Sequence, residues 1–168
     1  MSKYFLPLFS LVFLLQGCEG EEPITLPPNE LSVFAQNLVN THNRWRAEVG
    51  VVDLEWNEEL AEKAAELLDI DACRIRDNAD DLGQTGLYAA MGVTGKDVVN
   101  TWASFGPAYN YAADSCELSP GACDPYKQIV WANSKKVGCA NQLCFDGTSN
   151  MWVCLYDPKG NIEGEWPY

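Results

Sequence analysis

Seven cysteines in 168 residues constrain this chain more than any other feature of its sequence. One stands alone near the N-terminus, and six follow in the body: Cys73, Cys116, Cys123, Cys139, Cys144 and Cys154. Six cysteines allow fifteen disulfide pairings, and sequence alone does not choose among them. A zinc site is the competing interpretation, but no C-x-x-C pair supports it. The pattern indicates a domain cross-linked by disulfides in an oxidising compartment.

Three pairings are favoured by position. The loop ELSPGA separates one pair of cysteines, and Asp146-Gly147, a strong hairpin turn signal, lies midway between the members of another pair. Two antiparallel strands would bring that second pair face to face, which leaves the last two cysteines for each other. The favoured disulfides are Cys116–Cys123, Cys139–Cys154 and Cys73–Cys144. Each disulfide contributes about 2–4 kcal/mol.

The first eighteen residues, MSKYFLPLFSLVFLLQGC, resemble the leader of a bacterial lipoprotein. A short start with Lys3 precedes an apolar run from Phe5 to Leu15, which is too short to span a bilayer and has the size of a signal-peptide core. The ending LLQGC resembles a lipobox, which implies cleavage before Cys18 and diacylglyceryl modification of its thiol. Ordinary secretion, with cleavage at a nearby glycine, is the alternative.

The chain is therefore divided into a signal peptide at 1–17, an acidic, proline-bearing tether at 18–29 and one domain at 30–168. The lipid on Cys18 would attach the protein to a membrane. We expect a cell-envelope lipoprotein, periplasmic or surface-exposed, and otherwise an extracellular protein.

The net charge of −13 comes from 24 Asp and Glu against 11 Lys and Arg. A field of this sign repels phosphate backbones, so nucleic acid is not an expected partner.

The first half of the domain has helical patterns. Apolar residues recur at helical spacing from Glu30 to Val49, His42 falls on this apolar stripe, and Gly50 ends the predicted helix. The segment LEWNEELAEKAAELL predicts a second helix with Asn57 as its N-cap. A weaker third helix is predicted at about Lys96–Phe105.

After Asp124 the pattern becomes extended, in YKQIVWA, KKVGCAN and MWVCLYD. These segments predict at least three strands, two of them joined by the turn FDGTSN. Within CDPYKQIVW, Asp124-Pro125 is interpreted as a turn that leads into a scaffold strand. Helices followed by a hairpin-linked sheet indicate an α+β layered domain.

Four segments in a fixed order carry a family resemblance: THNRWRAEVGVVDLEWNEELAEKAAE, WASFGPAYNY, YKQIVWANSKKVGCANQLC and WVCLYDPKGNIEGEWPY. They resemble the opening, a helix end, the Tyr-Thr-Gln-Val-Val-Trp signature and the closing motif of the CAP superfamily (cysteine-rich secretory proteins, antigen 5 and plant pathogenesis-related proteins). The resemblance covers about residues 32–168. It implies a three-layer α-β-α sandwich with a mainly antiparallel sheet and disulfides.

Many members of this family gather two histidines and two glutamates in a central cleft that can hold zinc. The resemblance places these four positions on His42, Gln84, Phe105 and Pro125, so only the first keeps its residue type. A lone imidazole cannot complete a shell of four ligands, and Gln84 has no charge to attract a cation. Asp124 neighbours a lost position but would point elsewhere on an extended backbone. The resemblance therefore implies a degenerate cleft with no metal and no cofactor.

Phe105 and Pro125 would make this cleft more apolar. Some family members bind sterols or fatty acids in grooves between helices, so an apolar ligand is one hypothesis. A protein partner on the acidic surface is the other. The residues predicted to contact a ligand are His42, Phe105, Tyr109, Tyr126 and Gln128, whereas Trp102 and Trp131 are assigned to the core.

Catalysis has little support in the sequence. A Ser-His-Asp triad would have to use His42, the only histidine, and the expected disulfides leave no cysteine nucleophile. His42 is either a core histidine bonded to a backbone carbonyl or a tyrosine, or a cleft histidine that contacts a ligand. We expect a non-enzymatic binding or interaction module, with an apolar-ligand carrier and a divergent hydrolase as alternatives.

Overall fold

The computed structural model describes residues 31–168, so the predicted leader, Cys18 and the tether lie outside the described residues. Its helices are α1 (Val33–Glu48), α2 (Glu58–Glu66), α3 (Gly95–Ala103) and α4 (Asp124–Ile129), with short 3-10 turns η1 (Gly106–Ala108) and η2 (Tyr111–Ala113). Its strands are β1 (Glu55–Trp56), β2 (Leu68–Asp69), β3 (Arg74–Ile75), β4 (Gly83–Ala90), β5 (Tyr109–Asn110), β6 (Ser115–Cys116), β7 (Lys136–Leu143) and β8 (Ser149–Asp157).

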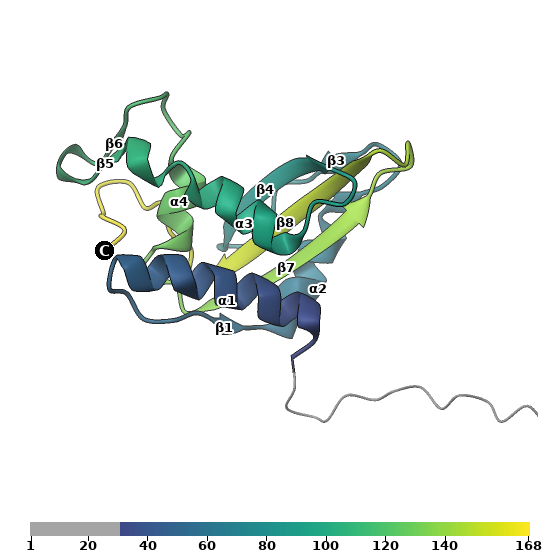
Figure 1. The fold of residues 1–168 in the computed structure, drawn as a ribbon, viewed down its shortest axis with the longest axis horizontal. Helices are drawn as coiled ribbons and strands as arrows, with labels where there is room; N and C mark the ends of the chain where they lie inside the picture. The colour runs from purple at the N-terminus through teal and green to yellow at the C-terminus, as the bar shows by residue number, and fades with distance from the viewer. Residues whose placement is uncertain (1–30) are drawn as a thin grey trace, which may run out of the picture.

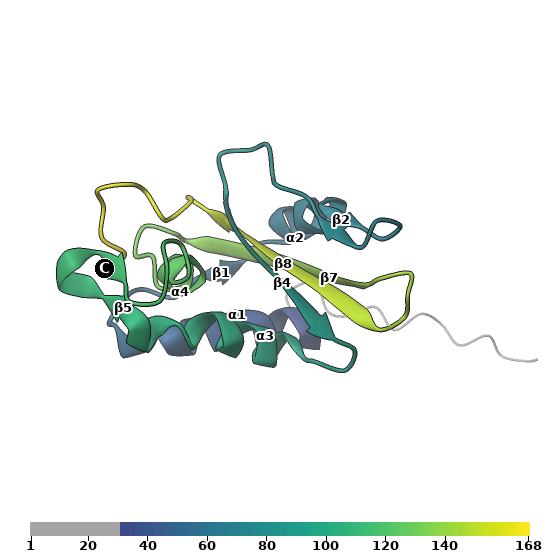
Figure 2. The same ribbon diagram turned by 90° about the horizontal axis from the view of Figure 1, so that it is seen from above.

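The central sheet has the strand order β1-β7-β8-β4 (Figure 1). β8 pairs antiparallel with both β7 and β4, while the short β1 runs parallel to β7. Helix α2 lies on one side of the sheet, and α1 and α3 lie on the other (Figure 2). The expected three-layer, mainly antiparallel sandwich is confirmed.

Strand β8 is the centre of the core because helices cover both of its faces. Side chains alternate along a strand, so neighbouring residues enter different clusters. Trp152, Cys154 and Tyr156 pack with α1, α3 and α4, whereas Met151, Val153 and Leu155 pack with α2. This explains why MWVCLY is an almost unbroken apolar run.

The three predicted helices form close to their expected bounds. In α1 the Ser32 hydroxyl accepts from the Ala35 N–H (3.1 Å), and Gly50, at φ 75°, follows the end of the helix. The Asn57 side chain caps α2 by accepting from the Leu60 N–H (2.9 Å), as predicted. Helix α3 begins with a capping box between Thr94 and Asp97.

The strand predicted in CDPYKQIVW is wrong: the segment forms helix α4, and only β7 and β8 follow residue 124. Pro125 lies in the first helical turn, where its missing N–H removes no hydrogen bond, and Asp124 adds a favourable acid there. Tyr126, Ile129 and Val130 lie at helical spacing and enter the core together. Packing of this face outweighs the β-propensity of the individual residues.

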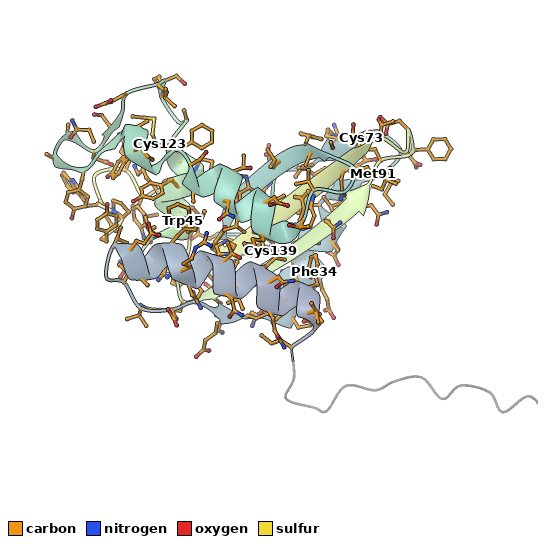
Figure 3. All side chains as sticks on the ribbon, in the orientation of Figure 1. Phe34, Trp45, Cys73, Met91, Cys123 and Cys139 are labelled. Carbon is orange, nitrogen blue, oxygen red and sulfur yellow. A yellow bond between two sulfur atoms is a disulfide. The ribbon has the colours of Figure 1, made fainter. Side chains whose placement is uncertain are left out.

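All three favoured disulfides are present: Cys73–Cys144, Cys116–Cys123 and Cys139–Cys154 (Figure 3). Cys139 and Cys154 are direct partners in the β7–β8 ladder, as the hairpin signal predicted. Between residues 31 and 168, no helix combines the length and the apolar character needed to cross a bilayer.

Candidate functional site

His42 lies in the core and has no solvent-exposed surface. Its Nδ1–H donates to the Leu38 carbonyl (2.9 Å), and the Tyr156 hydroxyl donates to Nε2 (2.8 Å). The Thr85 hydroxyl lies 3.1 Å from the same tyrosine oxygen and completes the chain. Burial lowers the pKa of His42 to about 4, with a smaller contribution from the charge of Arg46, against the opposing effect of the Leu38 hydrogen bond. His42 is therefore a neutral core residue, and its assignment to a cleft or to a ligand is wrong.

Gln84 lies on the opposite face of the sheet from His42. In the β4–β8 register Thr85 pairs with Cys154 and Gln84 with Leu155, so the Gln84 side chain faces the α2 side. Its Oε1 accepts from the backbone N–H of Asn78 (2.8 Å), and its Nε2 donates to a backbone carbonyl in the same loop. Gln84 thus stabilises a loop and does not join His42 in a cleft.

Phe105 and Pro125 lie in neighbouring segments. Phe105 directly follows α3 and is half-buried against the core, and its carbonyl oxygen lies 3.7 Å from the Cys123 sulfur. Pro125 lies two residues after that cysteine, in the first turn of α4. The four positions assigned to one degenerate cleft are therefore divided among the core, the α2 face and this junction.

Gln128 was expected to contact a ligand, but its side chain is buried and fully used within the domain. Its Nε2 donates to the Ser134 hydroxyl (3.0 Å), and its Oε1 accepts from the Gly160 N–H (2.8 Å). This prediction is wrong. Tyr126 lines a small hollow of about 210 Å³ between the C-terminal parts of α1 and α3, so it keeps access to the surface.

Tyr109 lines a second hollow, of about 280 Å³, beside the Cys116–Cys123 disulfide. The Tyr109 hydroxyl donates to Asp114 (2.8 Å), which also forms an ion pair with Lys127 (2.9 Å). Burial and the Asp114 hydrogen bond raise the pKa of Tyr109. Hydrogen bonds from Lys127 and Tyr109 lower the pKa of the Asp114 carboxyl, although its partial burial opposes this. These polar groups already satisfy one another.

Sequence reasoning missed Arg46, whose side chain is fully buried one helical turn after His42. Its guanidinium donates to four backbone carbonyls, those of Val52 (2.7 Å), Ile129 (2.9 Å), Trp131 (2.8 Å) and Ser134 (3.1 Å). Burial lowers the pKa of Arg46 to about 10, which leaves it charged at neutral pH. Arg46 joins α1 to the segment that follows α4. The spacing of Leu38, His42 and Arg46 along one helical face was the available signal.

A larger hollow, of about 620 Å³, lies between the N-terminal parts of α1 and α3. Phe34 and Trp152 form its apolar floor, with their rings stacked at 6.0 Å. The indole N–H of Trp152 is buried and has no hydrogen-bond partner. The other lining residues are Val33, Asn37, Gly92, Val93, Thr94, Gly95, Lys96, Asn141 and Asn150. We call this hollow the α1–α3 groove.

Residues 31–168 contain no group of three or more His, Cys, Asp or Glu side chains that could hold a metal ion. The described cysteines are all in disulfides, and His42 is neutral and enclosed. The arrangement in this part of the chain is suited to binding by shape, apolar contact and hydrogen bonds.

Residues 39–156 match the sequence profile described as the cysteine-rich secretory protein family, CAP. The chain is 36% identical to the STS14 protein of Solanum tuberosum, over 80% of this chain and 65% of that protein. It is 35% identical to a pathogenesis-related protein 1 of Arabidopsis thaliana, over 84% of this chain and 86% of that protein. The solved structure of Schistosoma mansoni venom allergen-like protein 4 superposes with a TM-score of 0.64 at 26% identity, over 82% of this chain and 95% of the other. This chain belongs to the CAP family of cysteine-rich secretory proteins.

Proposed function

We propose that this protein is a secreted, lipid-anchored and non-enzymatic CAP module that binds a fatty acid or a similar amphiphile in the α1–α3 groove. The observation that carries the ligand proposal is the apolar floor of the groove, where the rings of Phe34 and Trp152 stack at 6.0 Å beneath a hollow of about 620 Å³. Burial of an alkyl chain against these two rings is favourable, by about 25 cal/mol for each Å² of apolar surface removed from water.

The chemistry of the groove selects the ligand class. Phe34, Val93 and Trp152 offer apolar contact for an alkyl chain. Lys96 places a cation at the edge of the groove in a protein whose net charge is −13, so it is a favourable position for a carboxylate. This site replaces the cleft around Phe105 as the proposed ligand site.

The non-enzymatic part of the proposal rests on the state of the candidate catalytic groups. A general base needs a pKa near the working pH and contact with substrate, and His42 has neither. Attachment through Cys18 rests on the lipobox resemblance of LLQGC.

Titration with a fluorescent fatty acid tests the ligand. We expect saturable binding with a dissociation constant on the order of micromolar. Phe34→Ser removes one ring of the groove floor, so it should weaken binding, and Lys96→Glu should weaken carboxylate binding more than binding of the corresponding fatty alcohol. Tyr111→Phe, at the other end of the domain, is the matched control. No saturable binding across a panel of lipids would instead favour a protein partner on the acidic surface.

Mass spectrometry of the mature protein from its host tests the anchor. Acylated Cys18 at a new N-terminus is the expected result, and Cys18→Ser should lose both lipid labelling and membrane association. An unmodified Cys18 thiol in the native protein would refute the anchor without affecting the ligand proposal.

A further inference from the structure

One end of the domain carries three large apolar side chains that are mostly in solvent. Phe145 in the β7–β8 turn is 86% exposed, Val33 at the start of α1 is 74% exposed, and Met91 after β4 is 67% exposed. The Met91 N–H donates to the carbonyl of Thr148 (3.1 Å), which fixes the β4–α3 loop against the β7–β8 turn. We call Val33, Met91 and Phe145 the apolar tip.

Two of the three tip residues border the α1–α3 groove. Val33 lines the groove from α1, and Gly92, the neighbour of Met91, lines it from the opposite side. The start of α1 and the β7–β8 turn lie toward the same end of the molecule in both ribbon views, and the C-terminus lies at the other end (Figures 1 and 2). Phe34 and Met91 likewise lie toward this end, away from Cys123 (Figure 3).

We propose that the apolar tip docks into the lipid bilayer to which Cys18 attaches the protein, and this inference rests on the proposed lipid anchor. The segment that carries Cys18 joins the domain at the start of α1, beside the tip. From Cys18 to Leu31 a fully extended chain reaches at most about 45 Å, so the tether keeps the domain close to its membrane. A tethered surface meets the bilayer at a high local concentration, so weak apolar contacts are sufficient for docking.

The charge of the protein favours apolar insertion over electrostatic attraction. The net charge of −13 repels an anionic surface, and at this end the cation of Arg74 is paired with Asp69 (3.5 Å) while Asp97 and Asp146 oppose that of Lys96. The Asp146 carboxylate accepts from the backbone N–H groups of Thr148 and Ser149, which holds the turn that presents Phe145. The expected surface is therefore a zwitterionic bilayer, with shallow burial of the three side chains at its interface.

Docking in this orientation places the α1–α3 groove at the membrane surface, because Val33 lines the groove and Met91 is next to its lining residue Gly92. An amphiphile would then pass between the bilayer and the groove without crossing bulk water. The C-terminal end would face away from the membrane.

The test uses the full-length acylated protein in phosphatidylcholine vesicles, with and without brominated acyl chains. Phe145→Trp places a fluorophore at the tip, and Leu118→Trp, at another exposed site (63%) in the Cys116–Cys123 loop, is the control. Because the chain already has six tryptophans, each variant is compared with the unsubstituted protein. Brominated lipid should quench the fluorescence added at 145 and leave that added at 118 unquenched. Met91→Ser combined with Val33→Ser should reduce the quenching at 145.

Three outcomes would overturn the inference. Equal quenching at both sites means that the domain has no preferred orientation, and no quenching at 145 in protein acylated at Cys18 refutes docking while the anchor stands. A blue shift at 145 that depends on protein concentration without vesicles means that a second copy covers the tip. Intact mass measured on the same sample separates these results from failure of the anchor itself.

Discussion

The burial of His42 couples its protonation to the stability of the fold. The unfolded histidine binds a proton near pH 6.5, whereas the folded one does so only near pH 4, so the unfolded state holds more protons between these values. Stability should therefore fall as the pH drops from 7 toward 4, by about 2 kcal/mol at pH 5. Urea unfolding at a series of pH values measures this change.

The matched variant for this prediction is His42→Gln, which cannot take up a proton. It should be less stable at pH 7 because it loses buried hydrogen bonds, but the decline from pH 7 to 5 should largely disappear. The pKa of the carboxyl groups of Asp97, Asp114 and Asp146 is lowered, so their contributions are lost only below pH 4 and do not overlap this window. If the unfolding free energy of His42→Gln falls between pH 7 and 5 as much as that of the wild type, His42 is not the source of this pH dependence.

Substitution of Arg46 should lower the free energy of unfolding by a large amount. Arg46→Met removes the partner of four carbonyls in a site that water does not reach, at a cost of about 3–5 kcal/mol. Arg46→Lys should also destabilise, because an ammonium has three donors and cannot reproduce the planar fork. Arg44→Met, two residues away at the surface, is the control and should change the unfolding free energy little. A loss below 1 kcal/mol in Arg46→Met would show that these bonds are dispensable.

At the scale of residues, the sequence showed which side of α1 is buried but not what its polar side chains do there. In the sequence, the position of His42 was compatible with both a core histidine and a cleft histidine. Its partner Tyr156, which distinguishes the two, lies more than a hundred residues later. The spacing of Arg46 from Leu38 and His42 indicated a buried position, but its partners are backbone carbonyls of a distant segment, which the sequence does not identify.

Strand β7 packs against the start of α2 through backbone, at Gly138. A β-carbon added there would lie 2.3 Å from the backbone nitrogen of Ala61 and 2.5 Å from the carbonyl oxygen of Asn57. Neither atom can rotate away, so Gly138→Ala should cost about 3 kcal/mol or more through separation of the helix from the sheet. Thermal unfolding measures the loss, and Ala140→Ser on the same strand is the milder control. Full stability in Gly138→Ala would mean that α2 does not approach the sheet this closely.

Among the helices, the sequence predicted those whose ends are marked by a local signal. The prediction was wrong for α4, whose helical conformation depends on tertiary packing. Asn57 and Gly50 mark a helix start and a helix end through backbone chemistry that needs no other segment. Helix α4 is only six residues long, and its start, Asp124-Pro125, is as typical of a turn as of a first helical turn. It forms because Tyr126, Ile129 and Val130 are drawn into one core with α1 and α3.

For the whole molecule, the layers and the disulfides could be predicted, and the site could not. The Asp146-Gly147 turn sets the β7–β8 register, which brings Cys139 opposite Cys154. The proposed cleft failed because positions matched along a sequence need not face the same side of a sheet. Gln84 and Thr85 are neighbours in the chain, yet only Thr85 shares a face with His42.

The response to zinc tests whether His42, Gln84, Phe105 and Pro125 lie apart in the folded protein. A cation that binds only the folded state stabilises it by mass action, by about 2.7 kcal/mol at a hundred-fold excess over its dissociation constant. With His42 enclosed and Gln84 turned to the α2 face, zinc at about 100 μM should leave the melting temperature unchanged, because no metal-binding group of side chains is present within residues 31–168.

Restoring the lost residue types sharpens the test. Gln84→Glu, Phe105→Glu and Pro125→His together should still leave His42 unable to bind zinc, so adding His42→Gln to this triple variant should not change its response. A melting temperature that rises with zinc and loses the rise on His42→Gln would mean that α1 opens to release the histidine from Tyr156. That result would contradict both the buried network and the pH dependence assigned to it.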